Sequence, residues 1–308
     1  MRLLYGIPLF LLLVAASQAF ASERVITDGH GRKITVGDTS RIVSIGGSVT
    51  EIIYALGEQD RIVARDSTSS YPSQALSKKN IGYVRALSSE GVLSVKPTLI
   101  LALDGAGPPE VIEVLEKASV PMLSVPHKFS EEGVIEKIRF IGDVLEVQEK
   151  SEKLIKKVQE DFSKLKELTK DISKKDKVMF ILSMNGGRVL TSGRNTAAAA
   201  MIKMAGGENA ITGMEGYKPI ADEVIVSSRP TAILMMDRGG DHSIKNDELF
   251  KIASFSLTPV AKTRKVIRIN GLYLLGFGPR TASAARDLAD KLYGQSKSAS
   301  VSKKKQGE

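Results

Sequence analysis

Short apolar runs alternate with amphipathic stretches along most of this chain. Each run has the length of a buried strand, and helical periodicity follows it, as at 196–205 and 281–293. Alternating strands and helices are typical of parallel α/β sheets, so the pattern predicts α/β lobes. The predicted strands are 41–45, 62–64, 98–103, 121–125, 177–183, 189–190, 231–236 and 265–269.

A longer amphipathic segment, residues 146–169, separates the two halves of the chain. Its apolar positions recur at a period near 3.6 residues, and the opposite face is dense in Lys and Glu. At 1.5 Å per residue the helix would be about 35 Å long. Its pattern fits a helix that bridges two lobes, and equally a surface helix of one lobe. The apolar positions are Leu154, Ile155, Val158, Phe162 and Leu165.

The two halves also share a repeated motif. Residues 90–104 read EGVLSVKPTLILALD, and residues 223–237 read EVIVSSRPTAILMMD. In both copies a Glu suits the start of a helix, a Pro ends that helix seven residues later, and an apolar strand follows. Two unrelated αβ units would share this spacing only by chance, so the repeat predicts two related lobes.

The N-terminus has the three parts of a secretory signal peptide. Arg2 supplies the positive charge, residues 3–14 are mainly apolar, and Ala19-Phe20-Ala21 is an A-x-A cleavage signal. The apolar run is too short to cross a bilayer with margin. We therefore expect residues 1–21 to be a signal peptide that is removed after export.

Composition narrows the compartment and the partners. The chain has no cysteine, which rules out disulfides and a lipidated cysteine. An exported protein without a lipid anchor needs an outer membrane to retain it, so we expect a soluble periplasmic protein. The formal charge is +9, or +8 without Arg2, and suits an anionic small ligand; export argues against nucleic acid. Residues 295–308, rich in Lys and Ser, are predicted to be a disordered tail.

Three stretches together resemble the haem-binding periplasmic proteins of ABC importers, relatives of cobalamin- and siderophore-binding proteins. The first lies in 66–112 and includes DSTSSYPSQA and NIGYVRALSSEGVLSVKPTLIL. The others are GYKPIADE from Gly216 and GLYLLGFGPRTASAARDLA from Gly271. The resemblance spans 41–293 and implies a non-enzymatic carrier. Its α/β fold has two Rossmann-like lobes joined by a single long backbone helix, with the ligand in the cleft between them.

This resemblance gives the expected domain organisation. A signal peptide precedes an N-terminal lobe, a bridging helix, a C-terminal lobe and the tail. The expected boundaries are 1–21, 22–145, 146–170, 171–294 and 295–308.

The resemblance also implies that Tyr71, in Ser70-Tyr71-Pro72, is the axial ligand of the haem iron. Ferric iron is a hard acid and phenolate a hard anionic donor, and tyrosine is an established axial ligand. On composition alone a Tyr-Pro pair is an ordinary loop. Ferric haem needs such a donor, whereas a coordinatively complete siderophore does not.

Other side chains are candidates to support the haem. Arg238 follows the strand at 231–236, and α/β sheets bind ligands at the carboxyl ends of strands, so it is expected to reach the phenolate or a propionate. Without the family it is equally a solvated loop arginine. The three histidines lack a metal-ligand spacing, and we expect surface positions for His30, His127 and His242. Weaker haem-supporting candidates are Arg85, Lys128, His242 and Met184.

Glu90 and Glu223 occupy matching positions in the repeat. In the family that the chain resembles, a Glu on each lobe meets arginines of the permease dimer, and two symmetric carboxylates suit a two-fold partner. The simpler interpretation is charge pairing with a helix end. The implied partners are haem, an inner-membrane permease dimer with its ATPase, and an outer-membrane haem receptor upstream.

Two alternatives stay open. A siderophore or cobalamin carrier would use the same fold, which does not decide between ligands. A haem-modifying enzyme is the alternative of another class, and its best support is the Gly-rich turn IGGSVTE after a strand. The sequence contains no G-x-G-x-x-G at that turn, no P-loop and no G-x-S-x-G.

Overall fold

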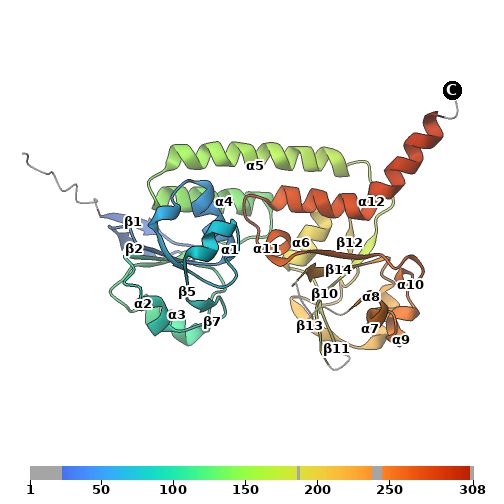
Figure 1. Cartoon of the computed structure of the whole chain (residues 1–308), viewed down its shortest axis with the longest axis horizontal. Helices are drawn as coiled ribbons and strands as arrows, with labels where there is room; N and C mark the ends of the chain where they lie inside the picture. The colour runs from blue at the N-terminus through green and yellow to red at the C-terminus, as the bar shows by residue number, and fades with distance from the viewer. Residues whose placement is uncertain (1–22, 186–187, 238–244, 306–308) are drawn as a thin grey trace, which may run out of the picture.

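Two β-sheets, each with its own helices, lie side by side beneath one long helix in the computed structural model (Figure 1). The structure describes residues 23–185, 188–237 and 245–305. The expected signal peptide, 1–21, lies outside these residues. Among the helices described, none is both long and apolar enough to span a membrane.

The N-terminal lobe contains a five-stranded parallel sheet in the order β5-β4-β3-β8-β9. Buried Ile, Val and Leu side chains fill both of its faces, as expected for strands covered by helices on each side. Two short antiparallel pairs, β1–β2 and β6–β7, stand beside it and were not predicted. The strands are β1 Arg24–Thr27, β2 Lys33–Val36, β3 Ile42–Ile45, β4 Ile62–Arg65, β5 Lys79–Asn80, β6 Gly82–Tyr83, β7 Ala86–Leu87, β8 Leu99–Leu103 and β9 Met122–Val125. The α-helices are α1 Gly47–Ala55, α2 Ser89–Leu93, α3 Pro109–Glu116 and α4 Glu131–Val144.

The C-terminal lobe contains a six-stranded sheet in which β13-β11-β10-β14-β15 are in order and β12 also pairs with β10. Its strands are β10 Lys177–Asn185, β11 Arg188–Ser192, β12 Glu208–Asn209, β13 Tyr217–Ile220, β14 Ala232–Asp237 and β15 Val266–Asn270. Its helices are α6 Ala197–Met204, α7 Asp222–Ser228, α8 Asn246–Leu249, α9 Ala253–Ser256, α10 Val260–Thr263, α11 Gly271–Leu275 and α12 Thr281–Lys305.

One edge of the C-terminal sheet differs from the predicted parallel arrangement. β11 pairs antiparallel with both β10 and β13. β11 begins at Arg188, only three positions after β10 ends at Asn185. A parallel pair needs a crossover of a dozen or more residues, so this short connection requires antiparallel pairing. The strands β10, β14 and β15 are parallel, as predicted.

The repeated motif has the same backbone in both lobes. β8 and β14 each lie between two parallel neighbours, β3 and β9 in one lobe and β10 and β15 in the other. Just before the shared Pro, Lys96 and Arg229 both adopt left-handed conformations, with φ of 50° and 48°. A left-handed non-glycine residue is uncommon, so its recurrence at matching positions supports duplication of one ancestral lobe.

A single helix, α5 (Gln148–Thr169), runs across both lobes (Figure 1). It packs on α4 of the N-terminal lobe and on α12 of the C-terminal lobe. Its predicted apolar stripe is confirmed, since Ile155, Val158, Phe162 and Leu165 are buried. The predicted fold, two α/β lobes joined by one backbone helix, is therefore confirmed. The boundaries 22–145, 146–170 and 171–294 remain our proposal for its domains.

The end of the chain differs from the predicted disordered tail. α12 continues to Lys305, so residues 295–305 extend the helix. Gly294, directly after the predicted helix 281–293, suggested that the helix ends there, but α12 continues through it, and neither Gly nor Pro follows before Lys305.

Candidate functional site

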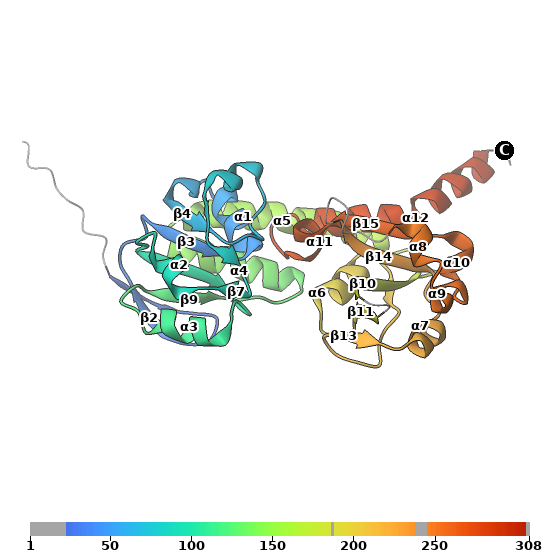
Figure 2. The ribbon, with the colours of Figure 1, turned by 60° about the horizontal axis from the view of Figure 1, so that its bottom comes forward.

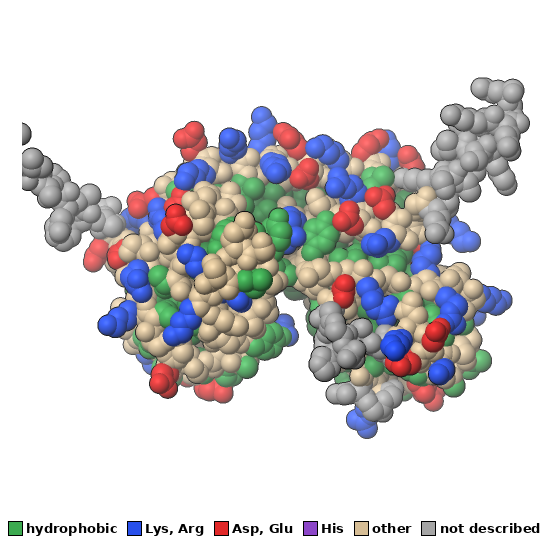
Figure 3. All heavy atoms as spheres, viewed as in Figure 1, with side chains coloured by type: hydrophobic (Ala, Val, Ile, Leu, Met, Phe, Trp, Pro, Cys, Tyr) green, Lys and Arg blue, Asp and Glu red, His purple; other side chains and the backbone are tan. Residues whose placement is uncertain are grey.

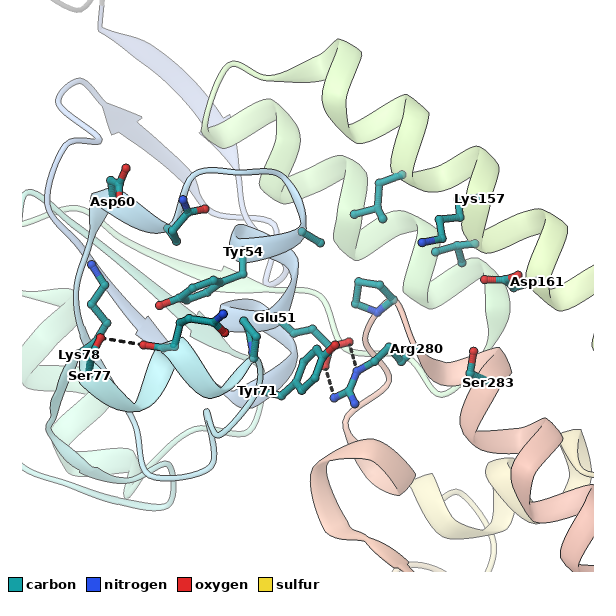
Figure 4. Close-up of a pocket in the computed structure, with 17 residues that line it drawn as sticks. Glu51, Tyr54, Asp60, Tyr71, Ser77, Lys78, Lys157, Asp161, Arg280 and Ser283 are labelled. Atoms are coloured by element: carbon teal, nitrogen blue, oxygen red, sulfur yellow. Dashed lines mark hydrogen bonds and ion pairs between the residues drawn. The ribbon is translucent and has the colours of Figure 1, made fainter.

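A pocket of about 650 Å³ lies where the two lobes meet α5 (Figure 4). Its size falls within the roughly 300–1,000 Å³ usual for small-molecule sites. Tyr54 and Tyr71 line it from the N-terminal lobe, Leu154 and Lys157 from α5, and Arg280 from the segment before α12. Figure 3 shows the surface also notched between the lobes, on the side away from α5. We call the pocket the inter-lobe pocket.

Tyr71 lies on a loop that follows the carboxyl end of β4, and hydrogen bonds fix that loop. Asp66 is fully buried, and its carboxylate accepts bonds from the Thr68 N–H at 2.8 Å and the Ser69 hydroxyl at 2.6 Å. The buried Arg65 guanidinium donates to the carbonyl of Asp66. The sequence DSTSSYP therefore forms an ordered turn that leaves Tyr71 42% exposed at the pocket wall.

Arg280 crosses from the C-terminal lobe to the N-terminal lobe at this pocket (Figure 4). Its Nε and Nη2 donate to the two carboxylate oxygens of Glu51 at 2.8 and 2.9 Å. Its guanidinium carbon also lies 3.4 Å from the centre of the Tyr71 ring. Burial disfavours the guanidinium charge, but the hydrogen-bonded Glu51 carboxylate outweighs it and raises the pKa of Arg280.

Neither Glu51 nor Arg280 was predicted to be a site residue. Arg280 belongs to GFGPR, in one of the stretches that carry the family resemblance, and this was its only signal in the sequence. Glu51 had no signal as a site residue, because a single acidic side chain on a helix usually faces water. The structure buries it at 5% exposure, under the Arg280 segment.

A second polar cluster lies beside the first, around the fully buried Lys137 of α4. Its ammonium is 2.8 Å from His127 Nδ1, 3.3 Å from the Ser48 hydroxyl and 3.2 Å from the carbonyl of Phe277 in the other lobe. Three acceptors match its three N–H groups. Burial lowers the pKa of Lys137 to about 7, against the opposing charge of Glu51.

The structure corrects our expectation that His127 is a surface residue. It is partly buried, in edge-to-face contact with Phe129 and bonded to Lys137. Burial, with the charges of Lys137 and Arg85, lowers the pKa of His127 to about 3. The expectation failed because one isolated His carries no periodic signal of burial. His30 is about half exposed and bonds to Asp104.

His127 should make the protein less stable as the pH falls below about 6.5. Its folded-state pKa lies below the ordinary 6.5, so between about pH 6.5 and 3 the unfolded chain binds a proton that the folded protein does not. We expect His127→Gln, which keeps an acceptor for Lys137, to reduce the loss of unfolding free energy between pH 6.5 and 4 by about 2 kcal/mol. Urea unfolding across this pH range measures the effect, with exposed His30→Gln as the control. An unchanged pH dependence would mean that folded His127 is protonated as readily as the unfolded residue.

The Gly-rich turn that suggested a phosphate cradle has another role in the structure. At Gly47, the first residue of α1, an added Cβ would lie 2.4 Å from a methyl carbon of Leu272 in the other lobe and 2.8 Å from the Thr68 carbonyl. Glycine is therefore required there because the two lobes touch at this point. The start of α1 is covered by protein, which removes the observation that favoured an enzyme.

The other predicted haem-supporting residues are scattered. Arg85, exposed in the β6–β7 turn, is close enough for its charge to act on His127 of one lobe and Tyr217 of the other. Lys128 is ion-paired with Glu136 at 2.7 Å. Met184 packs against the core of the C-terminal lobe. Among the described residues that line the inter-lobe pocket, Arg85, Lys128 and Met184 are absent. Arg238 and His242 lie outside the described residues.

Glu90 and Glu223 are exposed in the first turns of α2 and α7. Figures 1 and 2 place these two helices in different lobes, each on the side away from α5. The matching positions in the sequence thus become matching positions on the two lobe ends.

Comparison with known proteins agrees with this architecture. A sequence profile described as periplasmic binding protein matches residues 42–271. The periplasmic haem-binding protein RhuT from Roseiflexus sp. RS-1, in its apo form, is 35% identical; the match has a TM-score of 0.77 and covers 83% of this chain and 99% of RhuT. The uncharacterised ABC transporter substrate-binding lipoprotein YvrC of Bacillus subtilis is 28% identical over 87% of this chain and 85% of its own length. The vitamin B12-binding protein of Vibrio campbellii is 25% identical over 70% of this chain and 75% of its own.

Proposed function

This chain belongs to the periplasmic binding protein family, whose members serve ABC importers, and we propose that its particular ligand is haem. The protein takes up ferric haem between its lobes, with Tyr71 as the axial ligand of the iron. It then delivers haem intact to a permease dimer and its ATPase in the inner membrane.

The observation that carries this proposal is the position of Tyr71. Its ring lies at the wall of a pocket of about 650 Å³, on a loop that Asp66 and Arg65 hold in place. A hard oxygen donor presented from a rigid loop suits ferric iron. The similarity to RhuT supports the same ligand. Arg85, exposed between the lobes, is a candidate partner for a haem propionate, as are Arg238 and Lys128.

The route of haem through the cell envelope is part of the proposal. Residues 1–21 direct export and are removed, and the mature protein stays in the periplasm without a lipid anchor. An outer-membrane haem receptor supplies the ligand. Glu90 and Glu223, at the two lobe ends, meet basic side chains of the two permease subunits.

A cobalamin carrier is the second candidate, because a vitamin B12-binding protein is among the sequence relatives. A cobalamin or a siderophore brings a metal that is already fully coordinated, so neither would use the oxygen of Tyr71. The two classes of ligand therefore predict different spectra with the purified protein.

Titration of the apo-protein with ferric haem tests the function. We expect a shifted Soret band and a high-spin spectrum with a phenolate-to-iron charge-transfer band, saturating at a fixed stoichiometry. Parallel titrations with cyanocobalamin and a ferric siderophore should give no saturable change. Saturation by cobalamin with no response to haem would reverse the assignment, and a low-spin bis-histidine spectrum would exclude Tyr71 as the sole axial ligand.

A further inference from the structure

The ion pair between Glu51 and Arg280 joins the two lobes at the wall of the inter-lobe pocket. The residues are 229 positions apart in the sequence, and both N–H···O contacts are shorter than 3.0 Å. Bidentate pairing of a guanidinium with a carboxylate fixes direction as well as distance. Arg280 is therefore held in one orientation relative to the N-terminal lobe.

The burial of this pair makes it difficult to separate. The Glu51 side chain is 6% exposed, and that of Arg280 is 28% exposed. The backbone of Gly278 approaches the Glu51 carboxylate so closely that a Cβ there would lie 3.3 Å from Glu51 Cδ. Withdrawing Arg280 would leave a buried carboxylate without its partner, which is strongly unfavourable.

Tyr71 is the third member of this arrangement. The guanidinium plane that Glu51 orients lies over the tyrosine ring, at 3.4 Å from its centre. A cation over an aromatic face is attracted to the electrons of the ring, and an ionised phenolate is richer in electrons than a phenol. Figure 4 shows Arg280 reaching Glu51 and Tyr71 together from the opposite side of the pocket.

We propose that Glu51 and Arg280 are positioning residues for the iron ligand: the pair holds the Tyr71 ring in the orientation that presents its oxygen to the metal. The proposal rests on the proposed haem function. It adds that the ligand is correctly held only while the C-terminal lobe contacts the N-terminal lobe, because the two partners of the pair come from different lobes.

The test compares Arg280→Gln, Arg280→Lys and Glu51→Gln with a matched ion-pair control. Arg139→Gln is the control, because Arg139 pairs with Glu152 between α4 and α5, where both side chains are at least half exposed. We expect Arg280→Gln and Glu51→Gln to release haem to apomyoglobin about tenfold faster, as for loss of a residue that orients a metal ligand. Their charge-transfer band should shift, while Arg139→Gln matches the unmodified protein. Arg280→Lys, which keeps the charge but not the planar bidentate pairing, should fall between.

The reversed pair Glu51→Arg with Arg280→Glu separates positioning from simple lobe contact. It restores an ion pair between the lobes but places a carboxylate over the tyrosine ring. We expect its haem release to stay fast, because no guanidinium lies over the tyrosine ring. Recovery of slow release would overturn the positioning role and leave only a structural one.

Two outcomes distinguish the failure of this inference from that of the function. If the unmodified protein gives no haem spectrum, the haem function itself falls, and the positioning role with it. The positioning role alone is refuted by a different set of results. In that case the unmodified protein binds haem and Tyr71→Phe loses it, but folded Arg280→Lys and Arg280→Gln both keep the original spectrum and release rate. Circular dichroism on each variant shows whether it has folded; if Arg280→Gln does not fold, Arg280→Lys provides the deciding comparison.

Discussion

Replacing Tyr71 with phenylalanine should remove nearly all haem retention while leaving the fold intact. The change deletes one oxygen atom from a side chain that is 42% exposed, so the core is untouched. We expect haem transfer to apomyoglobin to be faster by at least about 100-fold. Loss of a residue that only supports a metal ligand weakens metal binding by up to about 100-fold, and loss of the ligand itself should cost more. The charge-transfer band should also disappear, because no phenolate remains to coordinate the iron.

Tyr54 provides a matched control for this substitution. It lines the same pocket from α1, and Tyr54→Phe likewise removes one hydroxyl from a partly buried ring. Haem release by Tyr54→Phe should equal that of the unmodified protein. If Tyr71→Phe retains haem equally well, another side chain is the ligand, and Arg85 and the region around Arg238 become the places to search.

The double substitution Glu90→Ala with Glu223→Ala should impair transport without affecting haem binding. Both carboxylates lie on the lobe ends away from α5 and outside the inter-lobe pocket. Exposed ion pairs contribute up to about 1 kcal/mol each, so losing two should weaken docking by roughly tenfold. Haem-dependent transport in vesicles that contain the permease and ATPase should fall accordingly, and each single substitution should be milder.

Salt and a neighbouring acidic residue serve as controls for docking. Raising the ionic strength should weaken docking of the unmodified protein, because it shortens the screening length of exposed charges from its value of about 8 Å at physiological salt. Glu110→Ala removes an acidic residue from the first turn of α3 in the same lobe as Glu90 and should have no effect. Undiminished transport by the double variant would show that Glu90 and Glu223 only stabilise the ends of their helices.

The fold was largely predictable because short stretches of the sequence determine where its strands and helices form. Apolar runs such as 98–103 are too uniform for an exposed strand, and the stripe from Leu154 to Leu165 has the period of a helix face. The repeat around Pro97 and Pro230 predicted two related lobes, and the left-handed residues before these prolines agree with it. The antiparallel edge of the C-terminal sheet was missed, although the gap between the predicted strands 177–183 and 189–190 is too short for a parallel crossover.

The site was predictable only in part, because its parts are far apart in the sequence. Tyr71 was predicted from a local stretch with a family resemblance, and the structure places it at a pocket wall. Its contact with Arg280, and the pairing of Arg280 with Glu51, depend on how the two lobes dock. The burial of Lys137 is likewise set by α4 and the Phe277 segment together, and a lysine on a helix gives no sign of it.

The position of α5 has a mechanical consequence for unloading. The helix packs on both lobes and contributes Leu154 and Lys157 to the pocket, so Tyr71 and Arg280 lie close to it. Glu90 and Glu223 lie at the opposite ends of the lobes. If the lobes turn about α5 as a fulcrum, each lobe is a lever with a long arm to the permease and a short arm to the Glu51–Arg280 pair. A modest force that spreads the lobe ends is then multiplied at that pair. Under the proposed function, a transporter that contacts only Glu90 and Glu223 would therefore loosen Tyr71, the proposed iron ligand.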